Sequence, residues 1–376
     1  MSDRLFISTR KGLFTLARSS DRRRRWTIAA TAFLGDPINL TTHDRRDGAI
    51  YSVLNLGHFG NKLRRSDDDG ATWQELLTPS YPEDATLYAN NFAPPTDARS
   101  KSRPAVLNEI WSLEPGGADE PSTLWAGTIP GGLFRSDDRG ASWRLVRELW
   151  DAPERAQWFG GGKDEPGIHS ICVDPRDSRH VTVGISCGGV WTTRDGGSSW
   201  TCVAHGMRAA FMPPELADNP NIQDPHRVVQ CAGAPDHYWA QHHNGIFRST
   251  NDCRRWEEIE NVSPSNFGFA VAVHPNDPLT AWFVPGVKDE RRIPVEAKFV
   301  ATRTRDGGQS FETLTRGLPQ EHAYDLVYRH ALDVDDSGSR LAMGSTTGGL
   351  WTSEDGGDSW EALDARLPPV YAVRFG

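Results

Sequence analysis

The sequence predicts an all-β protein, folded as one seven-bladed β-propeller domain over residues 1–376. Three observations predict this fold class. An eight-residue turn pattern recurs seven times, strand-like runs surround each copy, and a single strand-like tail follows the last copy. A unit of this length, repeated along a whole chain, is typical of propellers, in which every repeat forms one four-stranded blade.

The recurring pattern is Ser/Thr-x-Asp-x-Gly-x-Ser/Thr-Trp, and we call its copies the repeat turns. Asp and Ser/Thr side chains can hydrogen-bond nearby backbone amides, and glycine supplies a positive φ at little cost. The aromatic residue begins the next strand and offers a large apolar surface. We therefore expect a structural role for the aspartates of the five well-preserved copies: Asp68, Asp138, Asp195, Asp306 and Asp355.

Two of the seven copies are decayed. The copy from Ser19 to Trp26 lacks the glycine, and the copy from Ser249 to Trp256 has lost both the aspartate and the glycine. We therefore expect Trp256 to tolerate substitution better than Trp200, which closes a well-preserved copy.

The two ends of the chain complement each other. The first unit holds only three strand-like runs, Leu5 to Thr9, Gly12 to Ala17 and Arg25 to Ala29, whereas Pro369 to Phe375 forms one lone run after the seventh unit. The tail can supply the missing innermost strand of blade one. Closure of this kind removes exposed sheet edges, so we expect the C-terminal strand to close the ring.

Composition excludes several classes of protein. A net charge of −9 argues against a nucleic-acid partner. Five cysteines without a CxxC pair argue against a disulfide framework and against a structural zinc site. No apolar run approaches the roughly 18 residues of a membrane helix, so no membrane partner is expected. The first residues lack a charged-then-apolar signal region, and we expect a cytoplasmic protein.

The repeat turns resemble the Asp-box, or BNR, repeats of the sialidase-like superfamily, and the resemblance covers essentially the full chain. It implies a β-propeller similar to bacterial single-propeller proteins described as glycosyl hydrolases with BNR repeats. Sialidases carry an Arg-Ile-Pro motif ahead of their first repeat, whereas here Arg292-Ile293-Pro294 lies within the sixth unit. Sialidase propellers also have six blades, so exo-sialidase activity is not expected.

A ligand site is expected on the face opposite the repeat turns. Each repeat turn joins the third and fourth strands of a unit, so the opposite face carries the second-to-third turns and the starts of the innermost strands, which converge on the axis. Connections longer than about 12–15 residues are often functional. Four long connections are expected to wall this mouth: residues 77–107, 149–167, 205–225 and 286–298.

Polar residues at these positions are the candidate site residues. The catalytic candidates are His226, His169, Glu109 and Asp224. The substrate-binding candidates are His58, His242, His243, His322, Tyr324 and Trp158. The candidate ligands for a divalent metal are His169, His226, His242 and His322.

Three interpretations of these residues stay open. Two or three neutral imidazoles with a carboxylate bind zinc, iron or manganese. One histidine with one carboxylate supports general acid–base chemistry near neutral pH. A polar, water-filled funnel supports no chemistry. We therefore expect a hydrolase or lyase that acts on a small polar, carbohydrate-derived substrate in the axial pocket, and the alternative is a non-catalytic propeller that binds a ligand or a protein partner.

Overall fold

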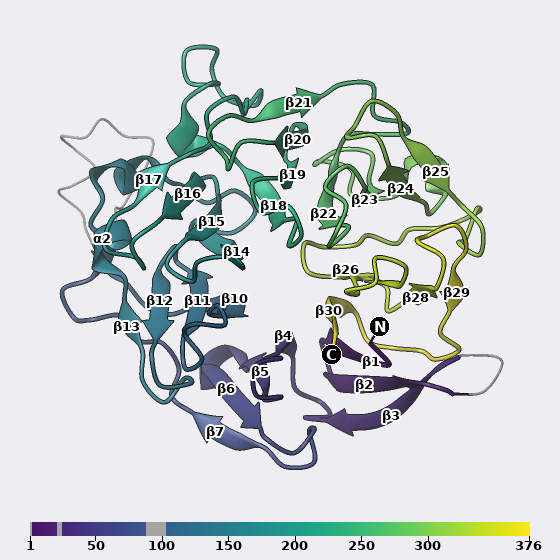
Figure 1. The fold of residues 1–376 in the computed structure, drawn as a ribbon, viewed down its shortest axis with the longest axis horizontal. Coiled ribbons are helices and arrows are strands. Elements are labelled where there is room, and N and C mark those ends of the chain that lie inside the picture. The colour runs from purple at the N-terminus through teal and green to yellow at the C-terminus, as the bar shows by residue number, and fades with distance from the viewer. Residues whose placement is uncertain (1, 21–24, 88–102) are drawn as a thin grey trace.

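The computed structural model describes residues 2–20, 25–87 and 103–376, and it shows a ring of seven four-stranded antiparallel sheets (Figure 1). The predicted fold class is therefore confirmed. Part of the decayed first repeat turn and part of the link into blade three lie outside the described residues. No helix in the described ranges is long and apolar enough to cross a membrane. The helical segments are single turns: η1 (Gly57–Phe59), α2 (Arg147–Trp150), η3 (Pro153–Gln157), η4 (Pro220–Ile222) and η5 (Val295–Ala297).

The ring closes inside blade one, where the two ends of the chain pair (Figure 1). Strand β30 is antiparallel to β1, with Leu5 opposite Phe375 and Ile7 opposite Val373. The side chains of Val373 and Phe375 are buried. The predicted closure is therefore confirmed. The strands of blade one are β1 (Arg4–Thr9), β2 (Gly12–Arg18), β3 (Trp26–Ala32) and β30 (Val370–Phe375).

The other six blades follow in chain order, each with its first strand nearest the axis (Figure 1). Blade two comprises β4 (Ile38–His43), β5 (Ile50–Asn55), β6 (Asn61–Ser66) and β7 (Gln74–Leu76). Blade three comprises β10 (Glu109–Pro115), β11 (Leu124–Ile129), β12 (Leu133–Ser136) and β13 (Arg144–Leu145). Blade four comprises β14 (Gly167–Val173), β15 (Val181–Ser186), β16 (Gly189–Thr193) and β17 (Thr201–Cys202).

Blades five to seven have the same order, and a separate two-stranded sheet lies in the link between blades two and three. Blade five comprises β18 (Pro225–Gln230), β19 (Tyr238–His242), β20 (Gly245–Ser249) and β21 (Glu257–Ile259), and blade six comprises β22 (Gly268–Val273), β23 (Ala281–Pro285), β24 (Ala301–Thr304) and β25 (Glu312–Leu314). Blade seven comprises β26 (Leu332–Val334), β27 (Leu341–Gly344), β28 (Leu350–Ser353) and β29 (Glu361–Ala362). The two-stranded sheet pairs β8 (Thr86–Leu87) with β9 (Arg103–Pro104).

The core lies between neighbouring blades. Strands β15 and β22 are buried at every position, because each blade packs between two others. A strand covered on both faces carries a continuous apolar run instead of an alternating pattern. This packing places the innermost strands rigidly around the axis.

The aspartates of the repeat turns close those turns. One carboxylate oxygen of Asp68 accepts the Thr72 N–H (2.8 Å), and the other accepts the Thr72 hydroxyl (2.6 Å). These hydrogen bonds hold the pKa of Asp68 at about 2. The same pair of contacts recurs at the four other aspartates, with Ser142, Ser199, Ser310 and Ser359 as donors.

The burial of Trp256 and Trp200 contradicts the expectation that Trp256 tolerates substitution better than Trp200. Trp256 is 1% exposed, and its indole N–H donates to the Val203 carbonyl (2.9 Å), although its repeat turn is decayed. Trp200 is only half-buried. We expect Trp256→Ala to lower the free energy of unfolding by about 3–5 kcal/mol, because truncating a buried aromatic residue leaves a cavity.

Urea denaturation of both alanine variants measures this difference. Trp200→Ala serves as the matched control, with an expected effect well below that of Trp256→Ala. Equal effects of the two substitutions would contradict the burial argument.

Candidate functional site

An axial cavity of about 770 Å³ opens on the face opposite the repeat turns. Its walls come from the starts of innermost strands, from second-to-third connections and from one link between blades, as expected. Six blades and the link between blades three and four contribute. The lining residues are Asp36, Pro37, Asn39, Asn55, Leu56, Gly57, Phe59, Glu109, Trp111, Gly161, Gly162, Lys163, Asp224, His226, His243, Phe269, Asp289, Arg292, Tyr328, Arg329, His330 and Tyr371.

A shared backbone irregularity directs side chains into the cavity. In six blades the innermost strand shifts register near its start, and a bulge of this kind turns a side chain away from the regular pattern. The residues at the shift are Asn39, Trp111, His169, His226, Phe269 and Tyr371. All of them except His169 line the cavity. In blade seven His330 lines it from just ahead of β26.

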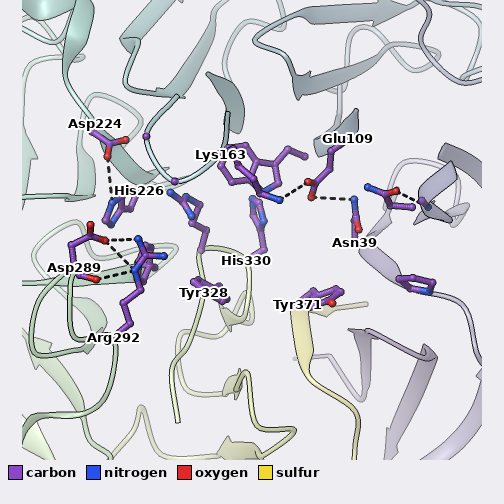
Figure 2. A pocket seen from close by; sticks show the side chains of 18 of the residues that line it. Asn39, Glu109, Lys163, Asp224, His226, Asp289, Arg292, Tyr328, His330 and Tyr371 are labelled. Atoms are coloured by element: carbon purple, nitrogen blue, oxygen red, sulfur yellow. Dashed lines mark hydrogen bonds and ion pairs between the residues drawn. The ribbon is translucent and has the colours of Figure 1, made fainter. Parts of the chain in front are cut away.

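Asp224 and His226 of blade five lie side by side in this wall (Figure 2). His243 of the same blade completes a group of three polar residues. Oxygen Oδ1 of Asp224 accepts the Ser186 hydroxyl (3.0 Å) and the Cys187 N–H (3.1 Å). Oxygen Oδ2 faces His226 Nε2 at 3.6 Å and His243 Nδ1 at 3.4 Å. We call these three residues the blade-five cluster.

The surroundings of the blade-five cluster shift the pKa values of its three members differently. Burial alone would raise the pKa of Asp224, but the two imidazoles and Arg329 hold it well below the usual range. Burial lowers the pKa of His226. Burial also disfavours protonated His243, yet the adjacent Asp224 carboxylate outweighs it and raises the pKa of His243. An ionised carboxylate therefore lies between two imidazoles of different basicity.

The guanidinium of Arg329 lies between two aromatic walls of the cavity. Its central carbon is 4.8 Å from the ring centre of Trp111 and 5.2 Å from that of Phe269. Its Nε is buried without a hydrogen-bond partner, and no ion pair joins Arg329 to any residue that the structure describes. Burial lowers the pKa of this guanidinium. Because arginine stays charged in proteins, an anion beside it would be stabilised.

The other cationic side chains of the cavity already have partners (Figure 2). Lys163 donates to Glu109 (3.0 Å), whose second oxygen accepts the Asn39 amide (3.2 Å). Arg292 pairs with Asp289 at 2.5 Å. Arg329 is therefore the cation of the described lining that remains unpaired.

Four of the sequence-predicted site residues line the cavity: Asp224, His226, His243 and Glu109. The first three offer ligand atoms within 4.8 Å of one another, and they are the one such His/Cys/Asp/Glu group found among the described residues. Of the predicted metal ligands, only His226 belongs to this group.

The remaining candidates lie outside the lining. His169 is buried behind it, edge-on to Trp111. His242 is buried and accepts the Asp224 N–H (3.1 Å), and burial lowers its pKa to about 3. Trp158 is fully buried against Trp191. His58 is exposed on η1, next to lining residues but not among them.

The expectations for His322 and Tyr324 are wrong. These two residues are candidates only if they stand at the start of the innermost strand of blade seven. That strand is β26 (Leu332–Val334), which begins well after both of them. His322 and Tyr324 are exposed in the link before it. The residues that occupy the mouth in blade seven are Tyr328, Arg329 and His330. Sequence reasoning missed them because a three-residue strand leaves little periodic pattern.

No family model matches the chain. Two fungal proteins are similar in sequence. An oligoxyloglucan-reducing end-specific xyloglucanase of Emericella nidulans is 34% identical over 274 residues, or 67% of this chain. A probable enzyme of the same description from Neosartorya fischeri is 23% identical over 287 residues, or 68% of this chain. The chain spans 32% of the length of each.

Solved structures share the fold. An ancestral GH74 enzyme superposes with a TM-score of 0.57 at 16% identity, covering 87% of this chain and 38% of that one. A functionally unknown protein from Desulfotomaculum acetoxidans gives a TM-score of 0.56 at 7% identity, covering 99% and 98% of the two chains. The chain is thus a seven-bladed β-propeller with xyloglucanase-like neighbours, and at these identities the structural likeness concerns the fold alone.

Proposed function

We propose that the axial cavity binds a small, carbohydrate-derived molecule that carries an anionic group, and that the protein hydrolyses a glycosidic bond in it. One observation carries this proposal. The unpaired Arg329 guanidinium and the blade-five cluster line the same 770 Å³ cavity. A cavity of this size suits a ligand of one to a few rings.

Arg329 would hold the anionic group of the ligand. Its buried, unpaired charge gains most from a carboxylate, which matches the guanidinium with two parallel hydrogen bonds. The rings of Trp111 and Phe269 fix the guanidinium in place and offer apolar surface to a sugar ring.

The blade-five cluster would activate the attacking water. Asp224 is ionised, and a base of this kind can take a proton from water as the water attacks the anomeric carbon. The glycosidic C–O bond breaks in the same step, and the departing oxygen takes up a proton from solvent. The similarity to xyloglucanases supports a glycosidic bond as the target. A small substrate suits this site better than a long glucan chain does, because the cavity lies on the propeller axis and has a volume of about 770 Å³.

A matched pair of ligands tests the proposal. Methyl uronides differ from the corresponding methyl glycosides in one carboxylate, and we expect wild-type protein to bind a uronide at least about 10-fold more tightly, since a charge-assisted hydrogen bond contributes about 1.5–3 kcal/mol. Arg329→Met retains the apolar volume and should abolish this preference in calorimetric titrations.

Arg291→Ala is the control, because it removes an exposed positive charge from the loop that carries Arg292. It should leave the preference unchanged. Hydrolysis of nitrophenyl uronides should be lost in Asp224→Asn while binding is retained. Equal binding of uronide and glycoside by the wild type would refute the anionic ligand, and binding without turnover would favour the non-catalytic alternative.

A further inference from the structure

The blade-five cluster has an arrangement of lone pairs that calls for a cation. His226 Nδ1 lies 2.6 Å from the Gly268 carbonyl. A carbonyl only accepts, so Nδ1 carries the proton and the lone pair of the neutral ring is at Nε2. That lone pair faces the Asp224 Oδ2 lone pairs at 3.6 Å. In the neutral state of His226 two acceptors therefore face each other, and they cannot form a hydrogen bond.

The distances within the cluster fit shared coordination better than hydrogen bonding. The 3.6 Å and 3.4 Å separations from Asp224 Oδ2 to the two imidazole nitrogens exceed the usual N–H···O range of about 2.7–3.2 Å. Ligands of a tetrahedral zinc ion with bonds of about 2.0–2.1 Å are separated by about 3.3–3.4 Å. The nitrogens of the two imidazoles lie within 4.8 Å of each other, so closure of the site around an ion needs these rings to move toward each other.

Two of the three ligands, His226 and Asp224, already have the outer support that metal sites use. Metal-bound histidines commonly donate their other N–H to a backbone carbonyl, and metal-bound carboxylates are themselves hydrogen-bonded. His226 donates to the Gly268 carbonyl. Asp224 Oδ1 is held by Ser186 and Cys187, which leaves Oδ2 free. The ring of His243 packs edge-on against Phe211 at 4.8 Å.

We propose that Asp224 Oδ2, His226 Nε2 and His243 Nδ1 bind one divalent transition-metal ion, with zinc as the best match. Two imidazoles and one carboxylate suit zinc, iron or manganese, whereas calcium and magnesium prefer oxygen ligands alone. All three residues line the axial cavity, so the open coordination position faces the ligand space. The site rests on the proposed function and deepens it: with the ion bound, Asp224 would act as its ligand rather than as the base, and the ion would polarise the attacking water. The occupancy of the site is measurable without any substrate.

Calorimetric titration of chelator-treated full-length protein with Zn²⁺ tests the site, together with the visible absorption of the Co²⁺-loaded protein. We expect one equivalent of Zn²⁺ to bind and Co²⁺ to give the spectrum of a tetrahedral complex. Asp224→Asn and His243→Ala should each weaken Zn²⁺ binding at least about 100-fold, because only two ligands remain. Far-UV circular dichroism checks that both variants stay folded.

His58→Ala is the matched control, because His58 is an exposed histidine on the second-to-third turn of blade two, on the same face. It should bind Zn²⁺ as the wild type does, and Ca²⁺ should not compete. The proposal is wrong if the wild type binds no Zn²⁺, or if Asp224→Asn and His243→Ala bind it as the wild type does. Zn²⁺ binding without uronide hydrolysis would refute the proposed function alone, and hydrolysis by a protein that binds no Zn²⁺ would refute the metal site alone.

Discussion

Deletion of residues 370–376 is expected to abolish cooperative folding of the ring. The deletion removes β30, leaves β1 with an unpaired edge, and takes away the buried side chains of Val370, Val373 and Phe375. Burying one such side chain contributes about 1.5–3 kcal/mol, so the loss is roughly 5–9 kcal/mol, comparable to the whole stability of a typical domain, about 5–15 kcal/mol. An exposed strand edge also promotes aggregation.

The truncated protein should be insoluble or should melt without a cooperative transition by circular dichroism. A synthetic peptide of residues 369–376, added in trans, should restore part of the transition because it can pair with β1. Tyr371→Ala is the control within the strand: Tyr371 lines the cavity, and its removal should leave the ring folded. A truncated protein as stable as the full chain would show that closure contributes little.

Acidification from pH 7.5 to pH 5 is expected to destabilise the protein strongly. Burial lowers the pKa of His169, His242 and His330, that of His242 to about 3. The unfolded chain binds protons at these imidazoles below about pH 6.5, whereas the folded protein does not. Stability is therefore full above about pH 6.5 and falls as the pH drops, by about 1.4 kcal/mol per pH unit for each imidazole.

Other groups do not reverse the sign in this window. The raised pKa of His243 contributes stability that is present at low pH and lost as the pH rises. This one imidazole is outweighed by the three named above and by His226, whose pKa burial also lowers. The lowered pKa of Asp68 matters only below about pH 4. Urea midpoints measured across the range should fall with pH, and His242→Gln should flatten the dependence, whereas His322→Gln, at an exposed position, should not. A constant midpoint would contradict the prediction.

The fold could be predicted from the sequence because its signals are local and repeated. Each repeat turn specifies its own geometry through an aspartate such as Asp68 and the hydroxyl four residues later. Closure could be predicted because a unit with three strands and a lone tail strand complement each other. The degree of burial at a repeat turn could not be predicted, as Trp256 shows. Its indole N–H donates to the Val203 carbonyl of the neighbouring blade, a contact between blades that the local pattern does not specify.

The site could be predicted only in part, because the alternation of residues along a strand does not predict which way a side chain points at a bulge. Asp224 and His226 flank the start of β18 and lie where the spacing placed them. His169 occupies the corresponding position in β14 but is buried behind the lining. No sequence motif marks Arg329. Its guanidinium lies over the rings of Trp111 and Phe269, which belong to two other blades, so its place in the site could not be predicted from the sequence around it.

Residues from both ends of the chain line the axial cavity, so a ligand bound there would stabilise the closed ring. Asn39 and Tyr371 both line it, although almost the whole chain separates them, and Tyr371 belongs to the strand that closes the ring. No proteolytic fragment that lacks a blade can retain the binding site intact. A molecule that binds only the closed ring shifts the equilibrium away from the open one. Ligand bound on the axis would therefore stabilise the pairing of β1 with β30 and slow the degradation of the protein.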